Sequence, residues 1–165
     1  TDSAELLRAV KYRKGRETAI AMGRLMADEY LSDHGTTCLF DGIDLIIPVP
    51  LTRERQEWRG FNQSLEIARG VSEVTGIPID DTAVIRLFVN SSQTNLSHAE
   101  RRENVSGVFF CRHPERLHGK HLLLIDDVIT TGATMLSLAH SILEDTHDIR
   151  LSVLSLAAAG EYKLL

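Results

Sequence analysis

The thirteen residues from Leu122 to Thr134, LLLIDDVITTGAT, constrain the fold more than any other part of the sequence. Leu122 to Ile125 is a continuous apolar run, which is the pattern of a strand covered on both faces in a parallel sheet. Asp126 and Asp127 follow at its carboxyl end, where open α/β sheets bind ligands. The sequence therefore predicts a ligand site directly after a buried parallel strand.

A loop of small and hydroxyl-bearing residues follows the acidic pair. It comprises Thr130, Thr131, Gly132, Ala133 and Thr134, and the apolar periodicity of a helix begins directly after it. Free backbone N–H groups and hydroxyls at a helix N-terminus suit a phosphate. The loop lacks the Lys of a Walker P-loop and the glycine spacing of dinucleotide folds. The neighbouring carboxylates suit ribose hydroxyls or a phosphate-bound Mg²⁺.

This stretch resembles the phosphoribosyl-pyrophosphate (PRPP) signature of the type I phosphoribosyltransferases, an acidic pair followed by a threonine-rich loop. The alternative is a buried strand that ends in a solvated Asp pair before a capped helix. The two interpretations predict the same strand and helix, and they differ in whether the carboxylates serve a ligand.

Size and composition bound the class of protein. The chain has 165 residues, of which 43% are hydrophobic and 25% charged, and this predicts one globular domain over residues 1–165. A formal net charge of −5 disfavours a nonspecific nucleic-acid surface over the whole molecule. Cys38 and Cys111 form no C-x-x-C pair, and no apolar run has the length of a membrane span. We therefore expect a cytoplasmic protein that does not contact membranes.

Apolar strands and amphipathic helices alternate along the chain, which predicts an α/β fold with a parallel sheet. The predicted strands are Asp44–Val49, Thr82–Val89, His121–Ile125 and Ile149–Ala157. The predicted helices cover Ala4–Val10, Ala19–Tyr30, a segment from about Asn62 to a C-cap at Gly76, and Gly132–Glu144.

A cationic segment follows the first predicted strand. Arg53, Arg55 and Arg59 are candidates to bind a polyanion from a loop, because guanidinium groups bond phosphate oxygens in pairs. The alternative is that Glu54 and Glu57 engage the same arginines in surface ion pairs. We interpret Trp58 and Phe61 as packing anchors and Asn62 as a helix N-cap.

Five ordered motifs resemble the ComF/GntX family, a branch of the type I phosphoribosyltransferases. They are a KY pair at Lys11, IIPVPL at Ile46, RGFNQ at Arg59, QTNLSHAERRENVSGVF at Gln93 and DDVITTGAT at Asp126. Two departures are notable. Thr52 stands where a histidine is common, and the cysteine-rich zinc ribbon of the family is absent from these residues, so we expect it upstream of Thr1.

The resemblance implies a type I phosphoribosyltransferase fold: a mostly parallel central sheet flanked by helices, with a small hood and a flexible loop. It assigns the PRPP 5′-phosphate to Thr130, Thr131, Gly132, Ala133 and Thr134, and the pyrophosphate to Leu51, Thr52 and Arg53. Asp126 and Asp127 would bind the ribose hydroxyls, and also Mg²⁺ partly through PRPP. Gln93–Asn104 resembles the loop that closes over the pyrophosphate, with Arg101 and Arg102 as its catalytic cations. The alternative for this loop is an exposed polar hairpin.

The resemblance also implies a glycosyltransferase activity. The protein would bind Mg-PRPP and transfer the 5-phosphoribosyl group to or from a nitrogen nucleophile with pyrophosphate exchange, as a homodimer. No motif identifies the acceptor base or amine. Two alternatives remain open: a PRPP- or nucleotide-sensing module without catalysis, and a competence accessory protein that binds single-stranded DNA or a DNA-processing partner. An aromatic content of 5% leaves few stacking platforms for the second.

Overall fold

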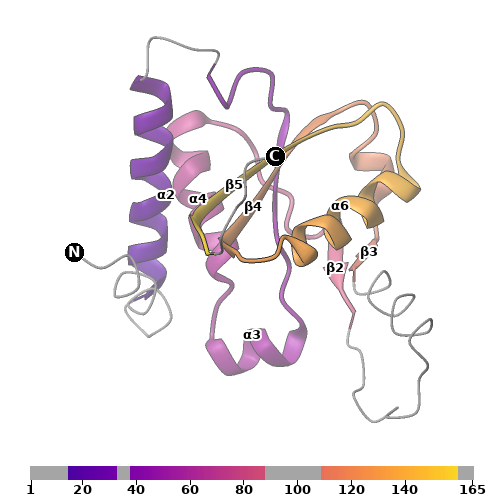
Figure 1. The fold of residues 1–165 in the computed structure, drawn as a ribbon, viewed down its shortest axis with the longest axis horizontal. Helices are drawn as coiled ribbons and strands as arrows, with labels where there is room; N and C mark the ends of the chain where they lie inside the picture. The colour runs from indigo at the N-terminus through magenta and orange to yellow at the C-terminus, as the bar shows by residue number, and fades with distance from the viewer. Residues whose placement is uncertain (1–14, 33–37, 88–108, 160–165) are drawn as a thin grey trace.

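The structure, a computed structural model, describes residues 15–32, 38–87 and 109–159 (Figure 1). The described part contains the helices α2 (Gly15–Ser32), α3 (Arg53–Arg59), α4 (Gln63–Thr75) and α6 (Ala133–Asp145) and the short 3-10 helix η1 (Pro114–Arg116). Its strands are β1 (Leu45–Pro48), β2 (Val84–Arg86), β3 (Phe109–Cys111), β4 (His121–Ile129) and β5 (Arg150–Ala158).

The central sheet is parallel, with the order β1-β4-β5. Leu45 pairs with Leu122 at one end of β1, and Pro48 pairs with Ile125 at the other. On its second side, β4 pairs with β5 from His121 to Ile129. The predicted α/β class with a parallel sheet is therefore confirmed, and the apolar run at the start of β4 forms its centre.

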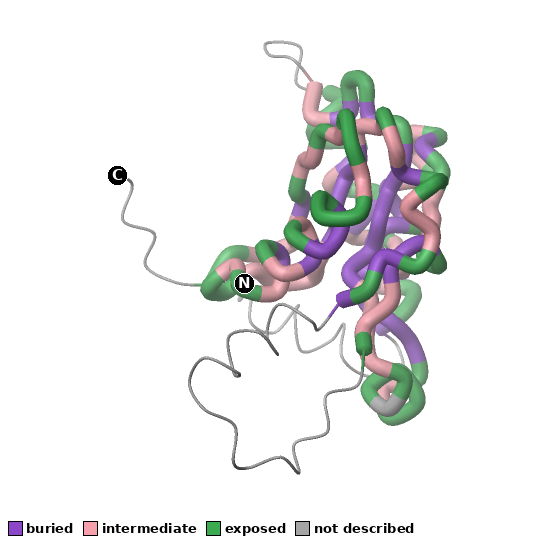
Figure 2. The backbone as a smooth tube through the Cα atoms, turned by 90° about the vertical axis from the view of Figure 1, so that its right-hand side faces the viewer, coloured by how far each residue is buried: buried purple, intermediate pink, exposed green. Residues whose placement is uncertain are grey.

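Both faces of β4 are buried, which explains its continuous apolar run. Leu123 and Ile125 pack into the core beneath α2 and α4, whereas Leu122 and Leu124 pack into the core beneath α6 and β3. Figure 1 shows α2 and α4 on one side of the sheet and α6 with β2 and β3 on the other. Figure 2 shows the buried segments running through the middle of the chain.

Helices α2 and α4 approach so closely that their contact requires glycine. A Cβ on Gly70 would overlap the backbone carbonyl oxygen of Ile20, and a Cβ on Gly23 would overlap that of Ile67. The predicted helix caps of α4 are confirmed: Asn62 accepts a hydrogen bond from the Ser64 amide, and Gly76 closes the helix with φ 73°. The orientation of α4 is thus fixed by its neighbour and by both of its ends.

The segment after β1 differs from the predicted loop. It forms α3, with Thr52 as N-cap and Gly60 at φ 81° as C-cap, because the polar run between these two residues has helical propensity and suitable caps. Phe61 is buried as expected, but Trp58 is 85% exposed, so the interpretation of Trp58 as a packing anchor is wrong. The seven-residue helix α3 packs too little of its surface against the core to cover the Trp58 indole.

The strand predicted over Thr82–Val89 is also largely wrong. Only Val84–Arg86 forms a strand, and it pairs antiparallel with β3 instead of joining the parallel sheet. The parallel neighbour of β1 on this side is a single bridge between Ile46 and Ile79. Asp80 lies between the Ile79 bridge and β2. Its carboxylate accepts hydrogen bonds from the Thr82 and Ala83 amides, and the resulting turn separates the bridge from the strand.

Other predicted boundaries shift by a few residues. Strand β4 continues to Ile129 because β5 pairs with it beyond the predicted end at Ile125. Helix α6 starts one residue after Gly132, and β5 starts one residue after Ile149. The predicted helix Ala4–Val10 lies outside the described residues. None of the described helices is both long and apolar enough to cross a membrane.

Candidate functional site

Asp126 and Asp127 lie where β4 outruns its neighbour β1. The last pairing of β1 joins Pro48 to Ile125, and the Val49 amide still donates to the Ile125 carbonyl at 2.8 Å. Beyond that point only β5 pairs with β4 among the described residues. The acidic pair therefore lies at the carboxyl end of the parallel sheet, where one side of β4 has lost its strand partner.

Asp126 is held by two donors. Its Oδ1 accepts a hydrogen bond from Ser64 Oγ at 3.0 Å and another from the Asp127 amide at 2.9 Å. Burial, and secondly the negative charge of Asp127, raise the pKa of Asp126 to about 6. At neutral pH the Asp126 carboxylate is therefore ionised but incompletely solvated, a state that favours a diol or a cation as partner.

The threonine-rich turn connects β4 to α6. Gly132 takes φ 79° as the N-cap of α6 and gives no side-chain cap, while the Ala133 amide donates a hydrogen bond to Thr131 Oγ1 at 3.3 Å. Thr130, Thr131 and Ala133 are exposed. The turn is thus solvent-accessible directly before the N-terminus of α6, a position that is compatible with the predicted phosphate cradle.

The predicted pyrophosphate residues Leu51, Thr52 and Arg53 follow the carboxyl end of β1, and Arg53 is the first residue of α3. Thr52 Oγ1 accepts from the Arg55 amide as the cap of α3, so this hydroxyl has a structural role. Arg53 pairs with Glu57 at 3.0 Å, as the ion-pair alternative predicted, yet it remains 89% exposed. A surface pair of this kind is weak and can yield to a phosphate.

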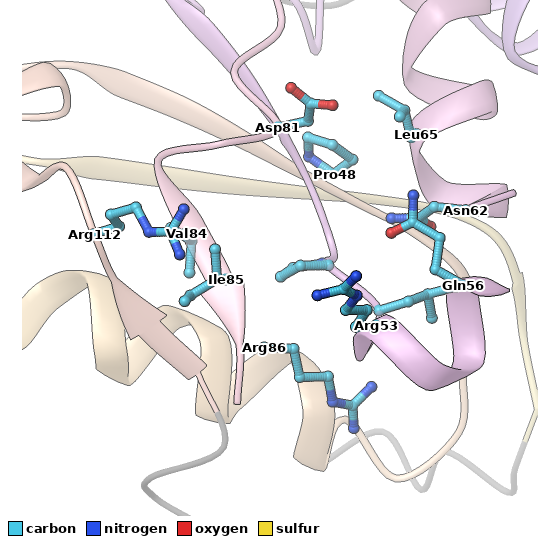
Figure 3. A pocket seen from close by; sticks show the side chains of 12 residues that line it. Pro48, Arg53, Gln56, Asn62, Leu65, Asp81, Val84, Ile85, Arg86 and Arg112 are labelled. Atoms are coloured by element: carbon cyan, nitrogen blue, oxygen red, sulfur yellow. The ribbon is translucent and has the colours of Figure 1, made fainter. Parts of the chain in front are cut away.

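A pocket of about 290 Å³ opens beside these residues. Figure 3 shows Arg53 and Gln56 from α3, Asn62 from the start of α4 and Arg86 from β2 around it. Pro48, Pro50, Leu51, Leu65, Asp81, Val84, Ile85 and Arg112 complete its lining. The pocket thus combines an apolar wall with three guanidinium groups from separate elements.

The sequence reasoning missed Arg86. Burial, and secondly the positive charge of Arg55, lower the pKa of this arginine, whereas the charge of Asp126 acts in the opposite direction. Arg86 Cζ lies 5.2 Å from the centroid of the Phe109 ring, and Arg86 has no carboxylate at ion-pair distance in the described part of the chain. The signal was present as a charged residue inside the apolar run IRLFV.

The first turn of α4 was predicted only as a cap. Asn62, Gln63 and Ser64 are all buried there, and Arg59 Nη1 donates to Gln63 Oε1 at 3.1 Å. Arg59 therefore braces this turn from the end of α3. The predicted loop Gln93–Asn104, with Arg101 and Arg102, lies outside the described residues.

Comparison with known proteins identifies relatives. No family model matches the chain. It is 34% identical over 140 residues to the DNA utilization protein YhgH of Escherichia coli K12. The matched region covers 85% of this chain and 60% of that protein. It is also 35% identical over 100 residues to the competence protein ComFC of Bacillus subtilis, over 61% of this chain and 38% of that protein. The chain thus matches 60% or less of the length of each of these relatives.

Competence protein F of Haemophilus influenzae is a third relative, 36% identical over 93 residues, which is 56% of this chain and 41% of that protein. Among solved structures, the glutamine PRPP amidotransferase of B. subtilis has a TM-score of 0.59 and 19% identity over 92% of this chain and 30% of that protein. At that identity the likeness concerns the fold alone. Relatives and fold together show that this chain belongs to the ComF family and has the type I phosphoribosyltransferase fold.

Proposed function

We propose that this chain binds Mg-PRPP at the carboxyl end of β4 and transfers its 5-phosphoribosyl group to a nitrogen nucleophile. The observation that carries the proposal is that the Asp126–Asp127 pair directly precedes the threonine-rich turn and that the charge of Asp126 acts on Arg86, which lines the arginine-rich pocket. Three adjoining surfaces suit the three parts of PRPP: amides for a phosphate, carboxylates for a diol, and guanidinium groups for a diphosphate.

In this proposal the 5′-phosphate occupies the turn Thr130–Thr134 and the ribose hydroxyls donate to Asp126 and Asp127. The diphosphate lies along Leu51–Arg53, and Arg86 faces it from β2 across the pocket. Low solvation strengthens the attraction of Arg86 for an anion, because its positive charge is incompletely screened by water.

Transfer at C1 requires that the C1–O bond to the diphosphate breaks while the nitrogen nucleophile forms a new bond to C1. The electron pair of the broken bond leaves with the diphosphate, so positive charge develops on the ribose ring and negative charge on the leaving group. Arg53 and Arg86 stabilise the leaving group, and the carboxylates hold the ring in place. No covalent bond to the protein is needed.

The carboxylate pair also suits Mg²⁺ carried by the substrate. The described residues contain no cluster of three His, Cys, Asp or Glu side chains, and two carboxylates are typical of Mg²⁺ that is held partly by substrate phosphates. When bound with PRPP, Mg²⁺ neutralises charge on the diphosphate as it leaves. We therefore assign Asp126 and Asp127 as the protein groups that face the ion.

Calorimetry with PRPP, with and without Mg²⁺, tests binding, and a pyrophosphate-release screen over bases and amines tests transfer. Arg86→Gln should weaken pyrophosphate binding by about tenfold, or about 1.4 kcal/mol. Arg150→Gln is the matched control and should leave binding unchanged, because Arg150 is exposed at the start of β5, at the opposite end of the sheet from the pocket. Binding of PRPP without turnover for any acceptor would favour the sensing module over the transferase.

A second candidate function is a role in DNA handling, which is favoured by the names of the relatives, DNA utilization protein and competence protein. It would use the arginines of α3 and β2 on a single strand or on a DNA-processing partner. Titration of labelled single-stranded DNA distinguishes the candidates. Binding that Arg86→Gln weakens but PRPP does not displace would support the DNA role.

A further inference from the structure

The first turn of α4 makes hydrogen bonds to both sides of the candidate site. Asn62 Nδ2 donates to the Val49 carbonyl at 3.0 Å, on the chain that leads into Leu51–Arg53. Two residues later, Ser64 Oγ donates to Asp126 Oδ1 at 3.0 Å. Asn62 is 8% exposed and Ser64 is 4% exposed, so neither bond competes with bulk water.

Capping of α4 does not require these two bonds. The cap needs only Asn62 Oδ1, which accepts from the Ser64 amide at 3.1 Å. The amide nitrogen of Asn62 and the hydroxyl of Ser64 are additional donors, and each reaches a different segment of the site. A hydrogen bond to a carboxylate is stronger than one between neutral groups, so the Ser64 bond restrains the rotamer of the half-buried Asp126 effectively.

The turn that carries both donors is itself held firmly. Gly70 of α4 contacts the α2 backbone without room for a side chain, and Glu66 is buried between Arg16 at 3.1 Å and Arg69 at 2.9 Å. Because the helix cannot slide against α2, its first turn provides a fixed reference for the two segments that it joins.

We propose that Asn62 and Ser64 are positioning residues that set the spacing between the diphosphate side and the ribose side of the PRPP site. The inference rests on the proposed function and goes beyond it, because it assigns a role to two side-chain donors that bond the protein itself, Asn62 Nδ2 to Val49 and Ser64 Oγ to Asp126. Ser64 acts through Asp126 on the ribose, and Asn62 acts through the loop after β1 on the diphosphate.

The test uses three ligands with calorimetry: ribose 5-phosphate, Mg-pyrophosphate and Mg-PRPP. Ser64→Ala should weaken ribose 5-phosphate and Mg-PRPP by about tenfold while changing Mg-pyrophosphate by less than about twofold. Asn62→Ser keeps a good N-cap but is too short to reach Val49, so it should weaken Mg-pyrophosphate and Mg-PRPP and spare ribose 5-phosphate.

Two further variants separate positioning from general destabilisation. Ser64→Thr retains the hydroxyl and should restore binding. Ser72→Ala removes a serine hydroxyl from the same helix, where it donates to the Ile77 carbonyl far from the carboxylates, and should leave all three affinities unchanged.

Unchanged ribose 5-phosphate binding in Ser64→Ala would overturn the inference, as would equal weakening of both half-ligands in each variant. These results presuppose that the wild-type protein binds Mg-PRPP. A wild-type protein that binds none of the three ligands would overturn the proposed function instead, and the inference with it.

Discussion

Asp126 and Asp127 are the residues on which the proposed chemistry depends most directly. We expect the double variant Asp126→Asn, Asp127→Asn to weaken Mg-PRPP binding by more than tenfold, about 1.4 kcal/mol or above, because an amide cannot accept a full set of diol hydrogen bonds or attract a cation. Calorimetry measures the change. Asp148→Asn is the matched control, since Asp148 is exposed at the opposite end of the sheet, just before β5. Equal affinities in wild type and double variant would refute the site.

The partial burial of Asp126 lowers the folding stability at neutral pH, where its carboxylate is ionised. Its pKa is raised from 3.8 to about 6 in the folded state, so the stability that its protonated form contributes is present below pH 3.8 and is lost as pH rises through about 6. Asp126→Asn alone should therefore raise the melting temperature above about pH 7, and this gain should shrink toward about pH 4. Thermal melting of wild type and variant at about pH 4 and at about pH 7 or above tests this prediction. A gain that does not depend on pH would contradict the assigned cause.

At the scale of elements, the sequence predicted those whose signals are local and strong. The apolar run of β4, the caps of α4 at Asn62 and Gly76, and the periodicity of α6 each follow from a handful of neighbouring residues. The antiparallel pairing of β2 could not be predicted, because its partner β3 lies beyond a long polar segment that gave no pairing signal. The end of β4 likewise depends on β5, a tertiary contact.

The same contrast between local sequence signals and tertiary contacts applies to the candidate site. The carboxylates and the threonine-rich turn are contiguous in sequence and were predicted together. Arg86 and Ser64 were missed because only the folded chain brings them to Asp126. A charged residue in a strand and a serine in a helix have no distinctive pattern by themselves, so their relation to the site had to come from the structure.

The close contact of α2 with α4 predicts an unusual sign for one substitution. Gly→Ala in the middle of a helix normally stabilises by roughly 0.5–1 kcal/mol. Gly70→Ala should instead destabilise by about 1–3 kcal/mol or more, because the new methyl group would overlap the Ile20 carbonyl oxygen and the neighbouring α2 backbone. Chemical denaturation provides the measurement. A stabilised variant would mean that the two helices can separate without cost.

At the scale of the whole molecule, the described cores are built from apolar side chains on both faces of one sheet. We expect the chain to fold without a structural metal, because Cys38 and Cys111 are far apart in sequence and structural zinc typically takes four Cys or His ligands in close pairs. EDTA should therefore change the melting temperature by less than about 2 °C, provided that PRPP is absent. A large drop on chelation would reveal a bound metal that the sequence does not signal.

The hydrogen bond from Ser64 to Asp126 joins residues that are 62 positions apart in the chain. Between them lie most of α4, then β2, β3, η1 and the first part of β4, so the bond can form only after a large loop has closed. Non-local pairing of this kind is slow compared with helix formation. During refolding, the recovery of ligand binding should consequently lag behind the recovery of helical signal, because the site is among the last features of the chain to be assembled.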